Sequence, residues 1–153
     1  MRLVRDNSAG VARWVASRIS FVGDAGFGNC TAIGVADSNG KAVAGVVYHD
    51  WQPQFKTMAF SIAADTPRFA TRRIIEALLR YPFDDVQIMK LWTATPHRNE
   101  RALRFAKGAG FTQEAVLSHH FGKDHAVINR MFLRDFKRLY EVKSGQAFRA
   151  DAA

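Results

Sequence analysis

The most constraining feature of the sequence is a turn signal, Asp37-Ser-Asn-Gly40, that lies between two apolar segments. An Asn-Gly pair accepts the positive φ angles that a tight hairpin requires. The flanking segments, 30–36 and 41–51, are apolar and partly β-branched, so we predict that they form antiparallel strands. A third segment of this kind, 55–63, follows Pro53 and continues the meander.

The rest of the chain alternates between helical and strand patterns. In chain order, these patterns predict a strand at 2–5, a helix from 8 with an apolar stripe to 19, a helix from Pro67 to Tyr81-Pro82, a strand at 86–95, a helix at 99–108, strands at 111–121 and 126–133, and a helix at 135–142. The fold class is therefore α/β: a mixed, mostly antiparallel sheet of six to seven strands flanked by helices. One strand–helix–strand step indicates a parallel pair. The 153 residues suit one domain, predicted at 1–142, with a flexible tail at 143–153.

Basic residues outnumber acidic ones, with 22 Lys and Arg against 14 Asp and Glu, which gives a formal net charge of +8. Such a charge favours a polyanionic partner. Three partners are open at this point: nucleic acid, an acidic membrane, or a small ligand rich in phosphate.

Several classes of protein are excluded by simple counts. Cys30 is the single cysteine, so the chain has no intrachain disulfide and no Cys-based zinc site, and we expect a small buried thiol. The apolar run at 42–48 is far shorter than the ~20 residues of a membrane helix. No apolar run follows the charged start of the chain, so we expect no secretory signal, no membrane partner and a cytoplasmic protein.

One segment in the second half of the chain resembles a known family motif. It reads Asn99-Glu-Arg-Ala-Leu-Arg-Phe-Ala-Lys-Gly-Ala-Gly-Phe111 and continues as Thr112-Gln-Glu-Ala-Val-Leu117. Together with the element order, it resembles the GNAT superfamily of acyl-CoA-dependent N-acetyltransferases over nearly all of residues 2–141. The resemblance implies that domain 1–142 transfers an acetyl group from acetyl-CoA, its cosubstrate, to a primary amine of a small molecule or protein.

In the family the fourth and fifth strands splay apart and hold the pantetheine arm of acetyl-CoA. The resemblance therefore places 60–64, which are Phe60, Ser61, Ile62, Ala63 and Ala64, along this arm, with a backbone N–H near Ile62 directed at the thioester carbonyl. Small side chains at Ala63 and Ala64 would let the ligand approach. Each alanine taken singly is equally well explained as a core residue.

The segment that would bind the pyrophosphate departs from the family pattern. Its three defining positions hold Ala70, Arg73 and Ile75 in place of the usual Arg or Gln and two small residues. A helix N-terminus still offers free N–H groups to phosphates. The candidate phosphate ligands here are cationic or hydroxylic side chains, namely Arg68, Thr71, Arg72 and Arg73. The alternative is that the arginines form a solvated helix face.

Two further positions come from the family motif. Asn99 is predicted to bond the pantetheine arm or to cap the next helix, and the two roles are compatible. Arg104 is a candidate ligand of a CoA phosphate, although a surface arginine is the simpler interpretation. The tyrosine that often protonates the leaving thiolate is replaced by Ala106.

Histidines supply the candidate general bases. His49 is the first candidate, at the end of a strand beside Asp50, and His119 is the second, near the turn between the last two strands. His119, His120, Asp124 and His125 form a polar hairpin, for which a solvated or substrate-facing role is favoured over a metal site. We expect no metal.

The acceptor site of the family corresponds here to 20–29 and 119–125. These segments carry no obvious acidic cluster for a polycationic acceptor. In relatives, strand exchange through the last hairpin is common, so a homodimer is a further expectation. The alternative function is a non-catalytic basic module that binds nucleic acid or CoA on a GNAT-like scaffold; no helix-turn-helix, zinc knuckle or glycine-aromatic RNA signature accompanies the basic residues.

Overall fold

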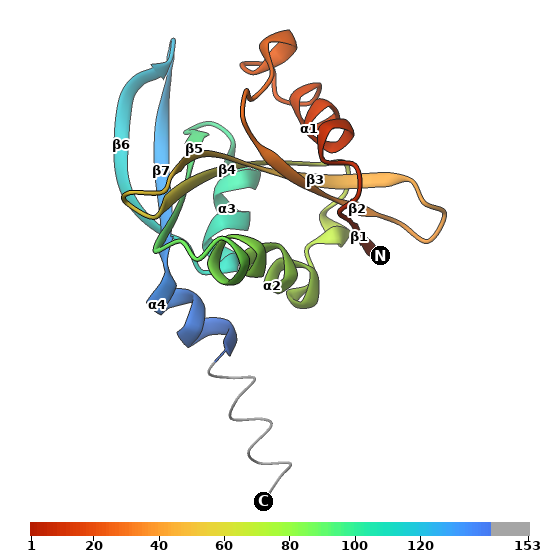
Figure 1. Ribbon diagram of the computed structural model, residues 1–153. Helices are drawn as coiled ribbons and strands as arrows, with labels where there is room; N and C mark the ends of the chain where they lie inside the picture. Colours follow the sequence, from red (N-terminus) through yellow and green to blue (C-terminus); the bar gives the residue numbers. More distant parts are fainter. Residues whose placement is uncertain (142–153) are drawn as a thin grey trace, which may run out of the picture.

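The computed structural model describes residues 1–141 and shows a single seven-stranded sheet with helices on both faces (Figure 1). The strands are β1 (Arg2–Val4), β2 (Thr31–Ala36), β3 (Ala42–Gln52), β4 (Thr57–Ala64), β5 (Lys90–Pro96), β6 (Thr112–Phe121) and β7 (Asp124–Phe132). Their order across the sheet is β1-β2-β3-β4-β5-β7-β6, and only β4 and β5 are parallel. The predicted mixed and mostly antiparallel α/β sheet is confirmed.

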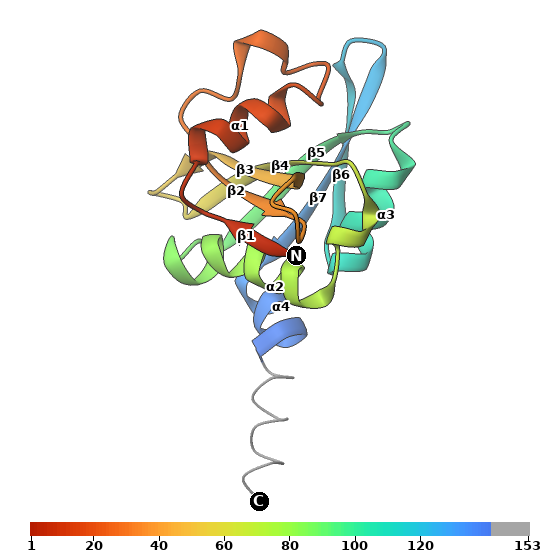
Figure 2. The same ribbon diagram turned by 90° about the vertical axis from the view of Figure 1, so that its right-hand side faces the viewer.

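Within residues 1–141, three α-helices and three short turns connect the strands, and a fourth helix and a fourth turn follow β7. The α-helices are α1 (Ser8–Ala16), α2 (Arg72–Arg80), α3 (Glu100–Ala109) and α4 (Leu133–Phe136). The turns are the 3₁₀ segments η1 (Gly23–Ala25) and η2 (Pro67–Phe69) and the π segments η3 (Tyr81–Asp85) and η4 (Lys137–Glu141). α1 covers one face of the sheet, while α2 and α3 cover the other (Figures 1 and 2). None of these helices is long and apolar enough to cross a membrane.

The predicted hairpin turn between β2 and β3 is confirmed. Asp37 Oδ1 accepts hydrogen bonds from the backbone N–H groups of Asn39, at 2.9 Å, and Lys41, at 3.0 Å. Gly40 has a φ of 80°, the left-handed conformation for which glycine is best suited. The turn could be predicted because all its partners are local.

β4 and β5 pair over three residues only, from Thr57/Lys90 to Ala59/Trp92. β5 then stays with β7, which pairs with it from Lys90 to Pro96. The second half of β4 therefore loses its neighbour on this side. This divergence is the expected splay of the central parallel pair, and it creates the opening described below.

The predicted helix at Pro67 starts later than expected. Pro67 opens the short turn η2, where Thr66 Oγ1 accepts from the Arg68 N–H at 3.2 Å. α2 begins only at Arg72, after Thr71, whose Oγ1 accepts from the Ile74 N–H at 3.3 Å. Two successive hydroxyl caps thus divide one predicted helix into a turn and a helix.

Other boundaries also differ from the prediction. α2 ends at Arg80, directly before Tyr81-Pro82 as predicted, but the wide turn η3 then continues through residue 85, so the next strand begins at Lys90 and not at residue 86. The first helix ends at Ala16 rather than near 19, and the glycine-rich segment after it contains η1. The last predicted helix is α4 followed by η4. The predicted tail at 143–153 lies outside the described residues.

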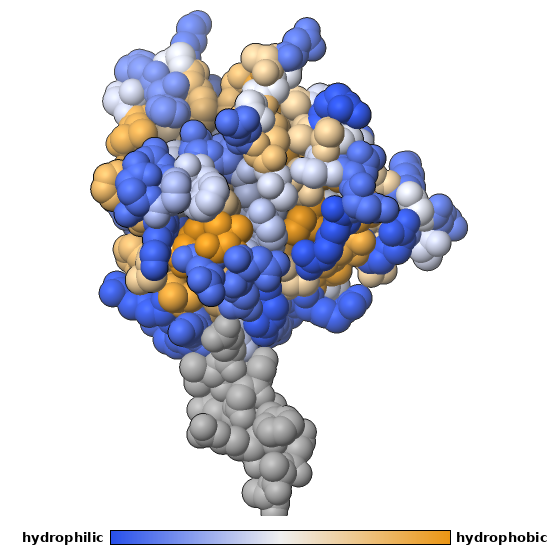
Figure 3. Space-filling view, viewed as in Figure 1, coloured by the Kyte–Doolittle hydropathy of each residue, from blue (hydrophilic) through white to orange (hydrophobic). Residues whose placement is uncertain are grey.

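The surface seen from the side of Figure 1 is mixed. Apolar side chains (orange) lie in separate patches, with hydrophilic side chains (blue) between them (Figure 3). This face therefore presents no single continuous apolar surface.

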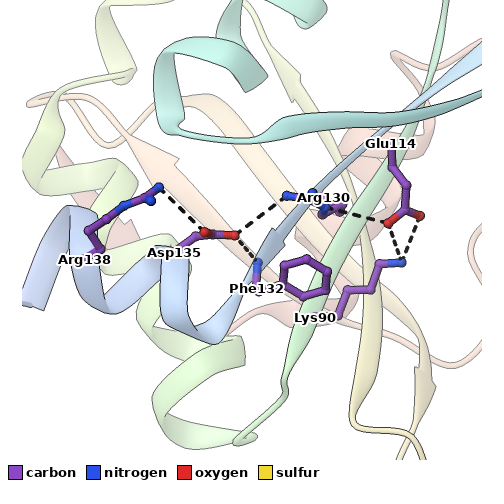
Figure 4. Close-up of polar contacts among 6 residues, drawn as sticks. All are labelled: Lys90, Glu114, Arg130, Phe132, Asp135 and Arg138. Carbon is purple, nitrogen blue, oxygen red and sulfur yellow. Dashed lines mark hydrogen bonds and ion pairs between the residues drawn. The ribbon is translucent and has the colours of Figure 1, made fainter.

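A series of charged side chains connects the edge strand β6 to α4 through β5 and β7 (Figure 4). Glu114 of β6 contacts Lys90 of β5 at 2.9 Å and Arg130 of β7 at 3.7 Å. Arg130 also lies 3.8 Å from Asp135 of α4, which accepts the Phe132 N–H at 2.9 Å. These contacts help to fix the edge strand β6 and the start of α4.

Candidate active site

A cavity of about 730 Å³ opens where β4 and β5 separate. Its walls come from the second half of β4, the connection to α2, the end of β5, the first turns of α3 and the segment after α1. Ile62, Ala63, Ala64, Asn99 and Arg104, all predicted from the sequence, line this cavity.

The backbone of β4 presents free polar groups to the opening. The Asp65 N–H donates to the Val43 carbonyl at 2.8 Å, and the register with β3 continues without a break to Ala59. Hydrogen-bonded pairs alternate along an antiparallel ladder, so odd-numbered residues of β4 bond to β3. Ile62 and Ala64 therefore direct their N–H and C=O groups toward the gap left by β5, where an extended ligand could pair with them.

Asn99 is the N-cap of α3, and its Oδ1 accepts the Ala102 N–H at 3.2 Å. The cap uses only the carbonyl oxygen of the side chain, so the amide NH₂ can still bond a ligand in the cavity. Arg104 also lines the cavity, and its guanidinium lies 4.0 Å from the Glu100 carboxylate one helical turn away.

The four candidate phosphate ligands at the start of α2 do not line the cavity, although Pro67, Phe69 and Ala70 beside them do. Arg72 donates to the Leu139 carbonyl and lies over the Tyr140 ring. Arg73 donates to the Met1 carbonyl at 3.4 Å. In this arrangement both side chains are directed at other parts of the chain, and the phosphate role of this group remains a prediction.

His49 lies at the end of β3 on the face that α1 covers. Its Nδ1 is 2.7 Å from Asp50 Oδ2 and its Nε2 is 2.9 Å from Ser61 Oγ. The Phe27 ring stacks on the imidazole at 5.4 Å between centroids, which leaves 17% of the His49 side chain exposed. The ring is thus held on three sides.

His119 lies near the tip of the β6–β7 hairpin and is not among the residues that line the cavity. The His119 ring Nδ1 is 3.1 Å from the Gly122 carbonyl, and the His119 backbone N–H donates to His125 Nδ1 at 2.9 Å. The His125 backbone N–H donates in turn to His97 Nδ1 at 3.0 Å. Among residues 1–141, no three His, Cys, Asp or Glu side chains are grouped so that they could hold a metal ion.

All three tyrosines of the chain have structural partners away from the cavity. The Tyr48 hydroxyl donates to the Leu78 carbonyl at 2.5 Å, and its burial raises the pKa of Tyr48 far above its usual value. Tyr140 donates to the Ala109 carbonyl, and Tyr81 packs against Tyr48. Ala106, at the position of the family's tyrosine, is buried. None of these residues is placed to protonate a leaving group in the cavity.

Several features of the site were not found by sequence reasoning. The family resemblance placed Ser61 along the pantetheine arm, but it did not reveal the contact of Ser61 with His49. Arg18 and Asp65 also line the cavity and form a bidentate ion pair, with Arg18 Nε 2.8 Å from Asp65 Oδ1 and Nη2 2.9 Å from Oδ2. This pair lowers the pKa of Asp65. Arg101 lines the cavity and has no ion-pair or hydrogen-bond partner in the described part of the chain. Such contacts depend on tertiary structure, so local patterns do not reveal them.

Neither a family model nor a curated protein sequence matches this chain. Solved structures do. One mutant of the Vibrio cholerae spermidine N-acetyltransferase SpeG is 14% identical, with a TM-score of 0.67 over 93% of this chain and 99% of that one. Another structure, of different mutant forms of the spermidine/spermine N-acetyltransferase SpeG from Vibrio cholerae, is 16% identical, with a TM-score of 0.65 over 72% and 71%.

A third solved structure has a different acceptor in its name. The ribosomal-protein-S5-alanine acetyltransferase from Vibrio fischeri is 17% identical, with a TM-score of 0.62 over 71% of this chain and 64% of that one. At identities this low, the structural likeness shows the fold alone, and this fold is that of the GNAT acetyltransferases.

Proposed function

We propose that this protein is a GNAT-superfamily N-acetyltransferase, which moves an acetyl group from acetyl-CoA to a primary amine of a small molecule or protein. The observation that carries the proposal is the free edge of β4 beside a cavity at the β4–β5 splay, in a chain with this fold. The enzyme is proposed to act in the cytoplasm.

The residues at the opening suit the cosubstrate. Ile62 and Ala64 offer backbone groups to the two amides of a pantetheine arm, and the small side chain of Ala63 leaves room beside them. Asn99 adds its amide NH₂. Arg104 and Arg101 bring positive charge to one rim of the cavity, where CoA phosphates would be attracted.

The segment before α2 supplies the other proposed phosphate contacts. The N–H groups of Arg72 and Arg73 belong to the first turn of a nine-residue helix and have no partner within the helix. Thr71, Arg68 and the side chains of Arg72 and Arg73 are included in this proposal. The two arginine side chains would have to leave the Leu139 and Met1 carbonyls to reach a phosphate.

Acetyl-CoA, when bound, supplies the activated acetyl group, and the chain must then polarise the carbonyl and accept a proton. The Ile62 N–H, directed at the opening, is proposed to bond the carbonyl oxygen. His49 is proposed as the general base, because its Nε2 lies 2.9 Å from Ser61 Oγ in the free half of β4. His119 remains the second candidate, on the far hairpin.

The acceptor is proposed to carry one amine rather than several. By their names, two of the similar structures act on spermidine, a polycation. Here the segments at 20–29 and 119–125 contain only Asp24 and Asp124 as acids, and Asp124 is paired with Arg98 at 3.0 Å. A polycation would find little compensating charge at this site.

A homodimer is also proposed. β6 is an edge strand of ten residues, and Val116 and Leu117 on it are exposed. An unprotected edge with apolar side chains is suited to pairing with a second copy. One of the similar structures is described as dodecameric.

Thermal unfolding with acetyl-CoA, with CoA and with single-stranded or duplex oligonucleotides tests the function. Saturating acetyl-CoA is expected to raise the midpoint, because a ligand that binds only the folded state stabilises it. Release of free thiol with a panel of amines then identifies the acceptor. A salt-sensitive shift with oligonucleotide and none with CoA would instead support the non-catalytic nucleic-acid module.

A further inference from the structure

Both ring nitrogens of His49 already have partners. Asp50 Oδ2 lies 2.7 Å from Nδ1, and Ser61 Oγ lies 2.9 Å from Nε2. The Phe27 ring covers one face of the imidazole. A substrate amine therefore has no ring nitrogen to approach directly, and any proton that reaches His49 must pass through one of its two partners.

The chemistry of these partners fixes the direction of the hydrogen bonds. An ionised carboxylate only accepts, so Nδ1 carries the proton that is shared with Asp50. Nε2 of the neutral ring is then the acceptor, and the Ser61 hydroxyl donates to it. In this arrangement Asp50 orients the His49 base, and the Ser61 hydroxyl is the group that the base activates. The lone pairs of Ser61 Oγ remain available to accept a proton.

Ser61 does not itself line the cavity, but it is partly exposed and directly precedes residues that do. It is two residues beyond Ala59, the last residue of β4 that pairs with β5, and the next residues, Ile62 and Ala63, line the cavity. Its side chain is on the same face as that of Val47, its register partner, and is half-buried. Of the three linked groups, Ser61 is therefore the one at the splay.

We propose that Ser61 is a catalytic residue, through which His49 receives the proton of the acceptor amine. The inference rests on the proposed function. As the amine nitrogen bonds the acyl carbon, its N–H bond breaks and the proton passes to Ser61 Oγ. The original hydroxyl proton passes at the same time to His49 Nε2. The C–S bond breaks with its electron pair left on sulfur, and the thiolate takes a proton from solvent. Asp50 is a positioning residue that holds the imidazole and stabilises its cationic form.

The test compares Ser61→Ala, Ser61→Thr and His49→Gln with the wild type, and uses Ser38→Ala, in the distant β2–β3 turn, as the control. Loss of general-base catalysis costs roughly 10²-fold or more, so Ser61→Ala is expected to lower kcat by about that factor. Ser61→Thr keeps a hydroxyl on a strand and should retain most of kcat. CoA affinity, measured by calorimetry, should be unchanged in all three variants.

Two readouts separate a relay from a structural role. The variant with both Ser61→Ala and His49→Gln should be no slower than the slower single variant, because residues that act as a unit are not additive. A proton inventory in mixed H₂O and D₂O should show two protons in transit in the wild type and fewer in Ser61→Ala. Wild-type kcat in Ser61→Ala, or losses that multiply in the double variant, would overturn the assignment.

Two other results have distinct meanings. An acetyl group found on Ser61 by mass spectrometry would overturn the relay, because it would make Ser61 a nucleophile. Failure of the wild-type protein to bind CoA would overturn the proposed function, and this assignment with it. Normal CoA binding combined with full activity of Ser61→Ala would overturn this assignment alone.

Discussion

Phe21 stacks on Phe121 with the two ring centroids 4.4 Å apart. Phe21 belongs to the segment after α1 and lines the cavity, while Phe121 ends β6. The contact brings together the two segments, 20–29 and 119–125, that the family resemblance assigned to the acceptor site. It joins parts of the chain that have no backbone pairing with each other.

Replacement of Phe21 with alanine tests whether this contact shapes the acceptor site. Phe21 is 51% exposed, so its loss should change the midpoint of unfolding little. The KM for the amine should rise several-fold while the Kd for CoA stays the same. Phe55→Ala is the matched control, because Phe55 is an exposed phenylalanine on the β3–β4 connection. Equal effects of the two variants on KM would argue against a role for the stack.

The cationic rim of the cavity predicts the position of the CoA phosphates. Arg101 and Arg104 line the cavity, whereas Lys107, on the same helix, does not. Combined replacement of Arg101 and Arg104 with alanine should weaken CoA binding about tenfold, which corresponds to about 1.4 kcal/mol. Lys107→Ala should leave the affinity unchanged. Titration calorimetry in low salt measures both.

Arg72 and Arg73 give a separate prediction about the same ligand. If the side chains of Arg72 and Arg73 bind phosphate, the double change to alanine should lower CoA affinity. If the side chains serve only the Leu139 and Met1 carbonyls seen in the structure, affinity should stay constant while thermal stability falls. Measuring both quantities on one variant decides between these roles, and an unchanged affinity would end the phosphate assignment of these two arginines.

Close packing of α1 on the sheet depends on two glycines. Gly34 and Gly45 are register partners, and a Cβ added at Gly45 would lie 2.7 Å from Val15 Cγ2 and 3.0 Å from Val11 Cγ1. Gly45→Ala should therefore destabilise the protein by about 1–3 kcal/mol, the usual cost of overpacking. Gly108→Ala is the control: nothing lies within 4 Å of its added Cβ, and alanine in a helix should stabilise by roughly 0.5–1 kcal/mol. Urea unfolding measures both, and a neutral Gly45→Ala would contradict the packing argument.

Much of the fold was predictable from the sequence because its signals are local. The Asn-Gly turn and the cap at Asn99 depend on neighbours a few residues away. The start of α2 was missed because Pro67 suits the first position of a 3₁₀ turn as well as that of a helix. The 3₁₀ turn begins after the hydroxyl cap Thr66 and the helix after the hydroxyl cap Thr71, so only the second cap leads into α2.

The site was predicted in part, for a physical reason. Ile62, Ala63, Ala64, Asn99 and Arg104 were placed by the family resemblance, and the structure brings these five to one cavity. The link from His49 to Ser61 was not predictable, because it depends on the register of β3 with β4 across an irregular connection. A shift of one residue would turn Ser61 to the opposite face of the sheet.

The ion pair between Arg18 and Asp65 predicts a pH dependence of stability. The hydrogen bond and the positive charge of Arg18 lower the pKa of Asp65 from its usual value of 3.8. A carboxylate whose pKa is lower in the folded state contributes stability that is present above the unfolded value and is lost as the pH falls through the folded one. The stability difference between wild type and Asp65→Asn should therefore be constant near neutrality and should shrink below pH 3.8. Urea unfolding at several pH values measures this difference. Asp37→Asn is the comparison, because the Asp37 carboxylate has no arginine partner among residues 1–141. A difference that grows in acid for Asp65→Asn would contradict the assigned pair.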